Sequence, residues 1–197
     1  MKQKQVTELL MQSLEHEKGG VLVYETALRC VINQDLREEW ETYLDEARNH
    51  VRILTEVCQT LGLDPETPSP ARTIVHKIGG SLVAAMVEAL SEGPPEAAQL
   101  IACECVVVAE TKDHLDWHLL SKCAEKLPGA MGRALTQACD EVEDQEDEHL
   151  YHSRGWCREL WIESLGMKAI LPPPEERKDV KNAVSAAQVA HRSEQGR

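Results

Sequence analysis

Residues 138–160, ACDEVEDQEDEHLYHSRGWCREL, hold a charged pair where a helix should present its core. Counting alternately four and three residues gives the positions on one helical face, which are Leu135, Cys139, Val142, Glu146, His149, Ser153, Trp156 and Leu160. Glu146 and His149 interrupt this mostly apolar face. Residues three apart project from the same side of a helix, so a carboxylate oxygen and an imidazole nitrogen can reach one point. Such a pair supplies ligands in one type of metal site found in helical proteins.

Three further segments show the same kind of interruption. Each can form a long helix with one mostly apolar face, and in each this face contains an acidic residue or a histidine. The segments and the residues concerned are 6–33 with Glu17, 36–61 with His50, and 96–127 with Glu110. Glu46 lies beside the face that carries His50, and His114 follows Glu110 on its face.

Capping residues and glycines divide the chain into these helices. Asn33 should end the first helix in a left-handed conformation, and Asp35 with Glu38 should start the second through a capping box. This pattern predicts a tight antiparallel hairpin. Gly129 follows the corresponding turn before the last long helix, which should extend to about residue 165.

The segment between the second and third of these helices predicts a crossover connection. Ser69 and Pro70 are an N-cap and a first-turn proline. The helix that they begin, about residues 70–91, would span about 30 Å, enough to carry the chain between the ends of a bundle. We therefore expect one all-α domain over residues 1–166. The extension at 167–197 is proline-rich, should then be partly helical, and is expected to have no chemistry of its own.

Gly19 and Gly20 lie inside the first predicted helix, where each costs about 1 kcal/mol relative to alanine. Two explanations are open. A neighbouring helix can approach the backbone closely at these residues, or the glycines can leave space beside Glu17.

The charge balance disfavours several kinds of partner. The chain has 34 acidic and 21 basic residues, a formal net charge of −13, which argues against nucleic acids and anionic membrane surfaces and favours cations. No run of 18 apolar residues exists, and the first residues, MKQKQVTELL, lack the apolar core of a signal peptide. Seven cysteines without a CxxC pair are typical of reduced, buried thiols. We therefore expect a soluble, cytoplasmic protein.

Equal distances from the turns predict that the interrupting residues share one level. Glu17 lies 17 residues before a turn at residue 34, and His50 lies 16 residues after it. Glu110 and Glu146 each lie 18 residues from the turn before the last helix. Antiparallel neighbours bring such residues side by side, so both hairpins should contribute to one layer.

Energetics favour a cation in this layer. A lone buried carboxylate costs several kcal/mol, so several together could consume a domain's whole stability of about 5–15 kcal/mol. A pair of divalent ions removes this penalty, because carboxylate oxygens and imidazole nitrogens become ligands. The alternative is that the helices are rotated and some of these glutamates face water.

Neighbouring residues offer further possibilities. Glu148 with His152 is a competing pair for Glu146 with His149 on the last helix. Tyr24, two turns after the first glutamate, is either a core tyrosine or a hydrogen-bond donor to a ligand.

Together these residues resemble the ferritin-like superfamily of carboxylate-bridged di-iron and di-manganese proteins, which includes bacterioferritin, rubrerythrin and manganese catalase. The family pattern is a glutamate on helix one, Glu-x-x-His on helix two, a glutamate on helix three and Glu-x-x-His on helix four. Glu17, Glu110 and the pair Glu146 and His149 match it. The resemblance covers residues 6–165 and implies an antiparallel four-helix bundle with a long helical crossover between helices two and three.

Helix two departs from this pattern. Ala47 stands three residues before His50, where the family has glutamate, and the nearest acid is Glu46, four residues before. A spacing of four still places both groups on one face. His114 is additional, since helix three of the family normally gives only its glutamate, and it could replace a missing ligand or act as a base beside the ligands.

The resemblance implies a dinuclear non-haem metalloprotein that holds two iron or manganese ions and reacts with dioxygen or peroxide as an oxidoreductase. The expected ligands are Glu17, Glu46, His50, Glu110, His114, Glu146 and His149, with Tyr24 close to them. Glu46 and Glu110 are expected to bridge the ions. We also expect a homodimer and, because the chain lacks a rubredoxin-like cysteine module, a separate electron donor. The alternative function is a metal-free, degenerate ferritin-like protein for helical interaction or stress, and the long C-terminal extension disfavours cage-type iron storage.

Overall fold

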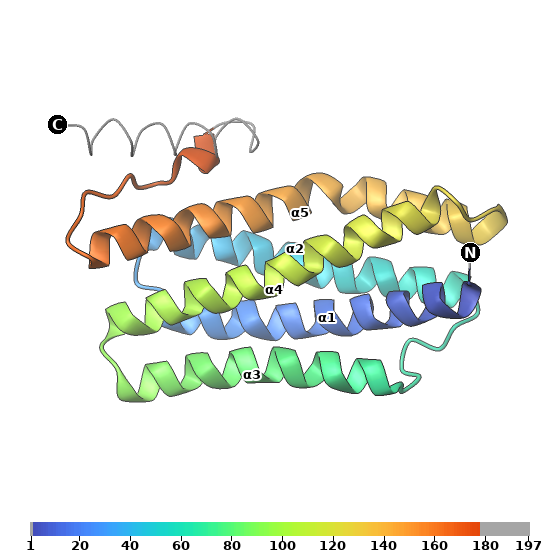
Figure 1. The fold of residues 1–197 in the computed structure, drawn as a ribbon, viewed down its shortest axis with the longest axis horizontal. Coiled ribbons are helices and arrows are strands. Elements are labelled where there is room, and N and C mark those ends of the chain that lie inside the picture. Colours follow the sequence, from blue (N-terminus) through green and yellow to red (C-terminus); the bar gives the residue numbers. More distant parts are fainter. Residues whose placement is uncertain (1, 178–197) are drawn as a thin grey trace.

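The computed structural model describes residues 2–177, and within this range the protein is all-α, as the sequence predicts (Figure 1). The elements are α1 (Gln3–Cys30), α2 (Gln34–Thr60), α3 (Pro70–Glu92), α4 (Pro95–Ala124), α5 (Gly129–Ser164) and the short 3-10 helix η1 (Pro174–Arg177). The partly helical end predicted for the C-terminal extension lies outside the described residues from 178 onward.

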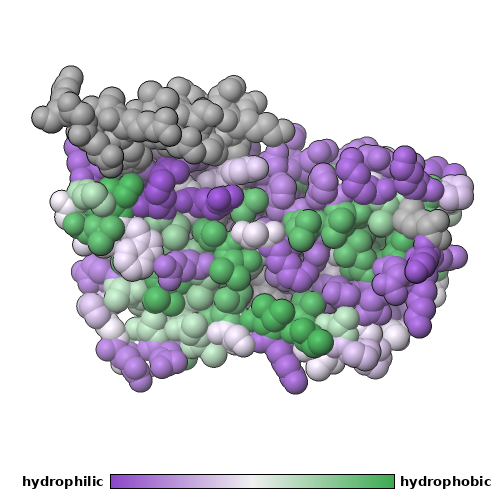
Figure 2. Space-filling view, viewed as in Figure 1, coloured by the Kyte–Doolittle hydropathy of each residue, from purple (hydrophilic) through white to green (hydrophobic). Residues whose placement is uncertain are grey.

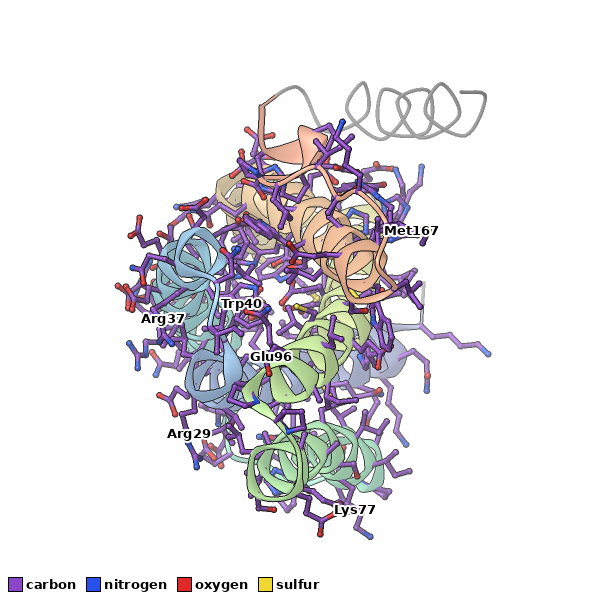
Figure 3. All side chains as sticks on the ribbon, turned by 90° about the vertical axis from the view of Figure 1, so that its left-hand side faces the viewer. Arg29, Arg37, Trp40, Lys77, Glu96 and Met167 are labelled. Carbon is purple, nitrogen blue, oxygen red and sulfur yellow. The ribbon has the colours of Figure 1, made fainter. Side chains whose placement is uncertain are left out.

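Four of the helices surround the core. α1 packs against α2 and α4, and α5 packs against α2 and α4, so these four close a ring. Figure 3 looks along the helices and shows Trp40 turned into the ring, whereas Arg37 and Lys77 lie outside. α3 packs against α1 and α4 from outside the ring. It runs the length of the molecule and returns the chain to the end from which α4 starts (Figure 1).

Two helix starts show how the caps form. Ser69 accepts a hydrogen bond from the backbone N–H of Arg72 at 3.2 Å, which confirms the predicted N-cap of α3. The left-handed conformation expected for Asn33 is wrong, since its φ is −71°. Its side chain instead accepts from the N–H of Leu36 at 3.0 Å and caps α2, the role predicted for Asp35 and its capping box.

α1 and α3 approach each other closely at two glycines. A Cβ atom added to Gly79 of α3 would lie 3.5 Å from the Cα atom of Gly19 in α1. A Cβ atom added to Gly19 itself would lie 3.9 Å from the Cα atom of Gly79, an ordinary van der Waals distance, so close approach does not require a glycine at residue 19. A Cβ atom at Gly20 would meet no atom within 4 Å, so this buried glycine leaves open space instead, one turn after Glu17. The explanation by open space therefore fits Gly20, and the packing of α3 does not explain why residue 19 is a glycine.

A polar layer divides the apolar core into two parts. One part includes Trp40 and Trp156 and draws on all five α-helices. The other part draws on α1, α2, α4 and α5 and includes Leu14, Leu54 and Leu120. Between them each of these four helices buries a titratable side chain almost completely, and these are Glu17, His50, Glu110 and Glu146.

The seven cysteines are all free thiols, and five of them are buried. Burial raises the pKa of Cys103 well above its usual range and that of Cys139 to about 12. The prediction of free, mostly buried thiols is confirmed. A thiol with a raised pKa is a poor nucleophile and a poor metal ligand.

Within residues 2–177, α3 is the one helix that could cross a membrane by length and composition alone. A single helix of this kind is weak evidence for a membrane span. Its outer face mixes apolar and polar residues, with Ile74 59% and Ile78 43% exposed beside the exposed Lys77, while Met86 is buried in the core. Exposed apolar residues also occur on α4, and Figure 2 shows apolar patches alternating with polar side chains across this face of the molecule. The cytoplasmic location stays a prediction.

Candidate metal centre

Two groups of potential metal ligands share the side chain of Glu146. Glu17 of α1 and His50 of α2 form one group with this residue, and Glu110 and Asp113 of α4 form the other. Within each group, one ligand atom per residue lies within 4.8 Å of the others, and all five residues are buried. Because both groups contain the same carboxylate, they are adjacent positions in one centre.

His50 lies between two carboxylates. Its Nδ1 atom is 3.2 Å from Oε1 of Glu146 and 3.5 Å from Oε1 of Glu17. Its Nε2 atom donates to Oε1 of Gln145 at 2.8 Å. Nδ1 therefore faces the layer, while Nε2 is held on the outer side.

His149 has the same orientation. Its Nδ1 atom is 3.6 Å from Oε2 of Glu110, and its Nε2 atom donates to Oε2 of Glu46 at 2.7 Å. The Gln145 amide donates to the other oxygen of Glu46 at 3.3 Å. The rings of His50 and His149 are stacked with centroids 5.6 Å apart. Glu46 and Gln145 thus fix the outer sides of both imidazoles.

Many buried polar atoms of the layer have no hydrogen-bond partner. Within the described residues they include Oε2 of Glu17, Nδ1 of His50, Oε2 of Glu110, Oδ1 of Asp113 and both carboxylate oxygens of Glu146. An unsatisfied buried group costs about 1–3 kcal/mol. Carboxylate oxygens and imidazole nitrogens are also the ligand atoms that suit iron and manganese. The residues present therefore fit a pair of divalent ions.

Charges within the layer shift the pKa values of its groups. Burial would lower the pKa of His50, but Glu146 and Glu17 raise it to about 11. Burial also opposes protonation of His149, yet Glu110 in particular raises its pKa to about 9. For Glu146, burial and the charges of Glu17 and Glu110 raise the pKa to about 7, although His50 acts in the opposite direction. Without metal, protonated imidazoles are the cations that balance these carboxylates.

Asp113 is a site residue that the sequence analysis missed. Burial and the carboxylates of Glu17, Glu146 and Glu110 raise its pKa well above the usual range, so without metal it carries a proton. Its position three residues after Glu110 repeats the spacing of Glu146 and His149. That Glu-x-x-Asp spacing is the signal by which it could have been found.

Aromatic side chains enclose the layer. The indole N–H of Trp117 donates to Oε1 of Glu17 at 2.6 Å. The ring centroid of Tyr43 lies 4.2 Å from that of His149, and the ring centroid of Tyr24 lies 6.1 Å from it. Burial, followed by the charge of Glu110, raises the pKa of Tyr24, so its hydroxyl keeps its proton.

The structure brings together five of the seven expected ligands, which are Glu17, His50, Glu110, Glu146 and His149. His114 is not in this group, because its Nε2 atom contacts Oδ1 of Asp147 at 2.9 Å and its side chain is 30% exposed. Glu46 is held at the outer side of His149 and has a side chain that is 24% exposed. Glu146 instead occupies the shared position expected for a bridge.

The competing pair on α5 does not form. Glu148 is exposed, whereas His152 lies near two other glutamates, Glu39 and Glu176. α5 therefore turns Glu146 and His149 toward the layer.

A pocket of about 520 Å³ between α4 and α5 reaches the layer. Its lining includes Trp117, Cys139 and Glu146, together with the paired side chains of His114 and Asp147. This pocket offers a small molecule a route to the shared carboxylate.

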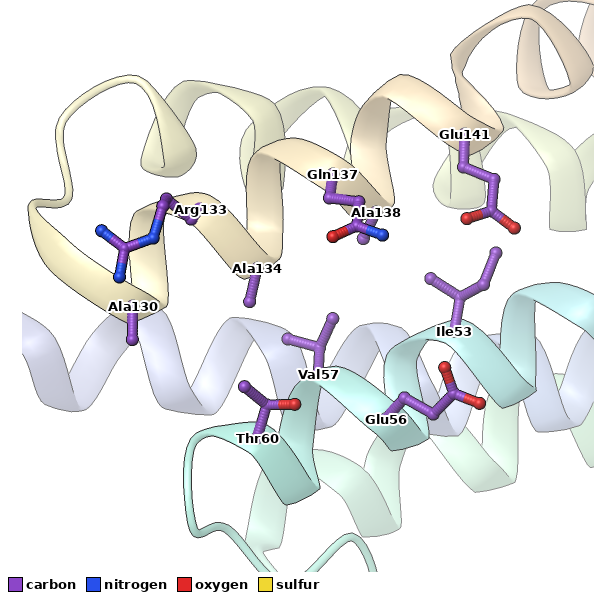
Figure 4. Close-up of a pocket in the computed structure, with 10 residues that line it drawn as sticks. All are labelled: Ile53, Glu56, Val57, Thr60, Ala130, Arg133, Ala134, Gln137, Ala138 and Glu141. Carbon is purple, nitrogen blue, oxygen red and sulfur yellow. The ribbon is translucent and has the colours of Figure 1, made fainter.

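Another pocket, of about 430 Å³, lies between α2 and α5 (Figure 4). Ile53 and Val57 of α2 face Ala134 and Ala138 of α5 across it. No residue of the two ligand groups lines this pocket, so it is separate from the centre.

The fold and the layer define a helical protein with a buried carboxylate and histidine centre. Comparisons with protein-family models, curated proteins and solved structures gave no significant match. The geometry of the centre is therefore the evidence from which a function can be proposed.

Proposed function

We propose that this chain is a ferritin-like, dinuclear non-haem metalloprotein that binds two iron or manganese ions and reacts with dioxygen or peroxide. The observation that carries the proposal is the position of Glu146. Both of its oxygens are buried without a hydrogen-bond partner, and the residue belongs to both ligand groups. Glu146 would therefore help to hold both ions.

The orientation of both histidines supports the proposal. Each directs Nδ1 toward the carboxylates and donates from Nε2 to an outer acceptor, Gln145 for His50 and Glu46 for His149. Such an outer hydrogen bond fixes the ring of a metal-binding histidine and raises its basicity. The two imidazoles are thus already held as ligands.

Charge also supports a pair of divalent ions. The first ion would be held by Glu17, His50 and Glu146, and the second by Glu110, Asp113, Glu146 and His149. These four carboxylates carry four negative charges when all are ionised, which two divalent cations would neutralise. Asp113 would compensate for Ala47, which stands where helix two of the ferritin-like pattern has glutamate.

The helix arrangement fits the same class. We assign α1, α2, α4 and α5 to an antiparallel four-helix bundle and α3 to its crossover connection, an architecture that ferritin-like proteins use. Each hairpin then contributes at least one carboxylate and one histidine to the layer.

When bound, two such ions would supply the redox chemistry for reaction with dioxygen or peroxide. The chain's own residues would control access and protons. The two apolar parts of the core exclude water from above and below the layer. The pocket between α4 and α5 admits a small molecule past His114, and the protonated Tyr24 lies beside Glu110. Electrons would come from a separate donor.

Metal analysis of Glu146→Gln tests this function. The full chain is purified without chelator, loaded anaerobically with Fe²⁺ or with Mn²⁺, and freed of unbound metal. We expect the variant to hold two ions fewer per chain than the wild type and to lose peroxide and dioxygen consumption. Glu148→Gln, an exposed change two residues away, is the control and should match the wild type. Equal metal content in Glu146→Gln and wild type would contradict the proposal.

A metal-free helical interaction protein is the second candidate. One observation favours it, because the protonated His50 and His149 already balance two carboxylates without any metal. In that case added Fe²⁺ or Mn²⁺ would raise the thermal stability of the wild type no more than that of Glu146→Gln. The dinuclear centre predicts a larger rise in the wild type, because an ion that binds the folded state alone stabilises it.

A further inference from the structure

We propose that Glu39 of α2, His152 of α5 and Glu176 of η1 form a second, mononuclear site for a divalent transition-metal ion. The ion would fasten the segment after α5 onto the helices. One ligand atom of each of these residues lies within 4.8 Å of the others. This site is built from different residues from the dinuclear centre and does not depend on it.

The imidazole of His152 faces two carboxylates. Its Nδ1 atom is 3.5 Å from Oε1 of Glu39 and 3.5 Å from Oε2 of Glu176. The side chains of Glu39 and His152 are each 12% exposed, and that of Glu176 is 18% exposed. Oε1 of Glu39 and Oε1 of Glu176 are buried atoms without a hydrogen-bond partner. Unsatisfied oxygens beside an imidazole nitrogen are the arrangement that a bound cation would complete.

The two carboxylates are held close together at a cost. Burial and the neighbouring charge of Glu39 raise the pKa of Glu176 to about 8. Burial opposes protonation of His152, but Glu39 and Glu176 raise the pKa of its imidazole, so without a metal ion a protonated His152 offsets part of the repulsion between the two carboxylates. A divalent ion would allow both to ionise.

Neighbouring side chains hold the first two ligands in place. The indole N–H of Trp156 donates to Oε2 of Glu39 at 2.6 Å, which leaves Oε1 free for an ion. The Tyr43 hydroxyl contacts Nδ1 of His152 at 2.8 Å and competes for that nitrogen. The same hydroxyl lies beside Glu39, whose charge, after burial, raises the pKa of Tyr43. When an ion occupies Nδ1, Tyr43 can donate to Glu39 instead.

The third ligand is delivered by a docked segment. Arg158 makes two hydrogen bonds to the buried carboxylate of Glu175, at 2.7 and 3.0 Å, next to Glu176. The absence of a side chain at Gly155 makes room for this segment, because a Cβ atom there would lie 2.9 Å from Oε2 of Glu175 and 2.9 Å from Cβ of Pro173. The segment that contains η1 therefore packs against α5 at Gly155, and this packing places Glu176 beside His152.

The ligand atoms indicate the kind of ion. One imidazole nitrogen with two carboxylate oxygens suits Zn²⁺, Mn²⁺ or Fe²⁺, with water at the remaining positions. Calcium and magnesium prefer oxygen ligands alone, so the histidine argues against them.

A titration in the Glu146→Gln background isolates this site. The full-length variant is stripped of metal, freed of chelator and titrated with Zn²⁺ in a calorimeter. We expect one Zn²⁺ per chain, and we expect Glu176→Gln in the same background to weaken binding by about 100-fold or more, since even an outer partner of a ligand contributes 10–100-fold. Glu38→Gln, an exposed change next to Glu39, should leave it unchanged.

His152→Gln is a second variant and should weaken Zn²⁺ binding as Glu176→Gln does. Hydrogen exchange at the backbone amides of residues 175–177 provides a readout of docking, and Zn²⁺ should slow it only when Glu176 is intact. Absence of Zn²⁺ binding in the Glu146→Gln background, or unchanged affinity in both ligand variants, would overturn the proposal. Either result is distinct from failure of the dinuclear centre, which would show as unchanged metal content on replacing Glu146.

Discussion

In the proposed dinuclear centre, protons and metal ions would compete for the same ligand atoms. His50, with a pKa raised to about 11, and His149, with a pKa raised to about 9, both carry a proton at neutral pH in the metal-free protein. A metal ion binds only the neutral imidazole. For His50 and His149, metal binding would therefore replace the proton on each imidazole by a metal ion.

This exchange predicts that affinity for Mn²⁺ rises as the pH rises from 6 toward 9. Each raised pKa means that a proton must leave His50 or His149, and proton release is favoured at higher pH. Calorimetry in buffers of different ionisation enthalpy should count at least three protons released when the centre fills at pH 7, one each from His50, His149 and Asp113. Binding heats that do not depend on the buffer would show that the two histidines are not ligands.

The free energy of unfolding of the metal-free protein should fall as the pH rises, whereas the affinity for Mn²⁺ should increase. Each histidine whose pKa is higher in the folded state than in the unfolded state stabilises the folded protein when it is protonated. This contribution is complete below pH 6.5, the pKa in the unfolded state, and is lost as the pH rises through about 9 for His149 and about 11 for His50. Denaturant unfolding of the metal-free protein should therefore show falling stability across this window. His50→Gln should flatten the fall, and an unchanged slope in that variant would contradict the assigned pairing.

Replacing Glu110 by alanine should abolish binding at one or both ion positions. The change removes a carboxylate from the second ligand group and the partner of Nδ1 in His149. Metal analysis after loading measures the loss, and Glu104→Ala, an exposed change on the same helix, is the control. Full metal content in Glu110→Ala would show that the ligand assignment is wrong.

Asp113 and His114 show the limit of counting along a helix. Adjacent residues are 100° apart around the axis, so both lie near the edge of a face centred on Glu110. Packing of α4 against α1 and α5 decides between them, and it turns Asp113 inward and leaves His114 partly exposed. The sequence alone does not determine how α4 is rotated about its axis relative to its neighbours.

At the scale of the element, α3 is attached to α1 through a buried ion pair. Arg72 of α3 donates to Glu15 of α1 through Nε at 3.1 Å and Nη2 at 2.6 Å. Arg72 also donates to the carbonyls of Pro65 and Thr67, each at 2.8 Å. This contact joins the start of α3 and the loop before it to the helix that carries Glu17.

Replacing Glu15 by glutamine should cost about 1–3 kcal/mol at pH 7, because Arg72 keeps its burial but loses its counter-charge. Burial would raise the pKa of Glu15, but Arg72 and then His76 lower it below its usual value of 4.5. Because its pKa is lower in the folded protein, ionised Glu15 stabilises the folded state above pH 4.5. This stabilisation is lost as the pH falls through the pKa that Glu15 has in the folded protein. Denaturant unfolding should thus show the cost of the variant shrinking in acid.

Glu66→Gln is the matched control for this prediction. Glu66 pairs with Lys18 of α1 at 2.6 Å but is 72% exposed. An exposed pair contributes only about 0–1 kcal/mol. Equal losses for the Glu15 and Glu66 variants would contradict the role given to burial.

Local signals predict the helices well, because prolines, glycines and the Ser69 cap act within one turn of the chain. All five predicted helices are present. Asn33 was assigned to the wrong helix, because an asparagine between two helices can end the first or cap the second, and the choice depends on how the chain turns between them.

At the scale of the molecule, two apolar clusters enclose one polar layer. The number of residues from each turn predicted which residues of α1, α2, α4 and α5 would be buried together. In two antiparallel helices, residues at equal distances from the connecting turn lie at the same position along the helix axes. The cluster of Glu39, His152 and Glu176 was not predictable in this way. Glu176 follows a run of prolines and returns to the helices through a docked segment that no periodicity describes.

An anomalous-scattering map from crystals of the full chain grown with Mn²⁺ tests the central claim most directly. We predict two peaks about 3.5–4 Å apart, one on each side of the Glu146 carboxylate. A map without peaks there, with Nδ1 of His50 still lying between Glu17 and Glu146, would contradict the dinuclear centre.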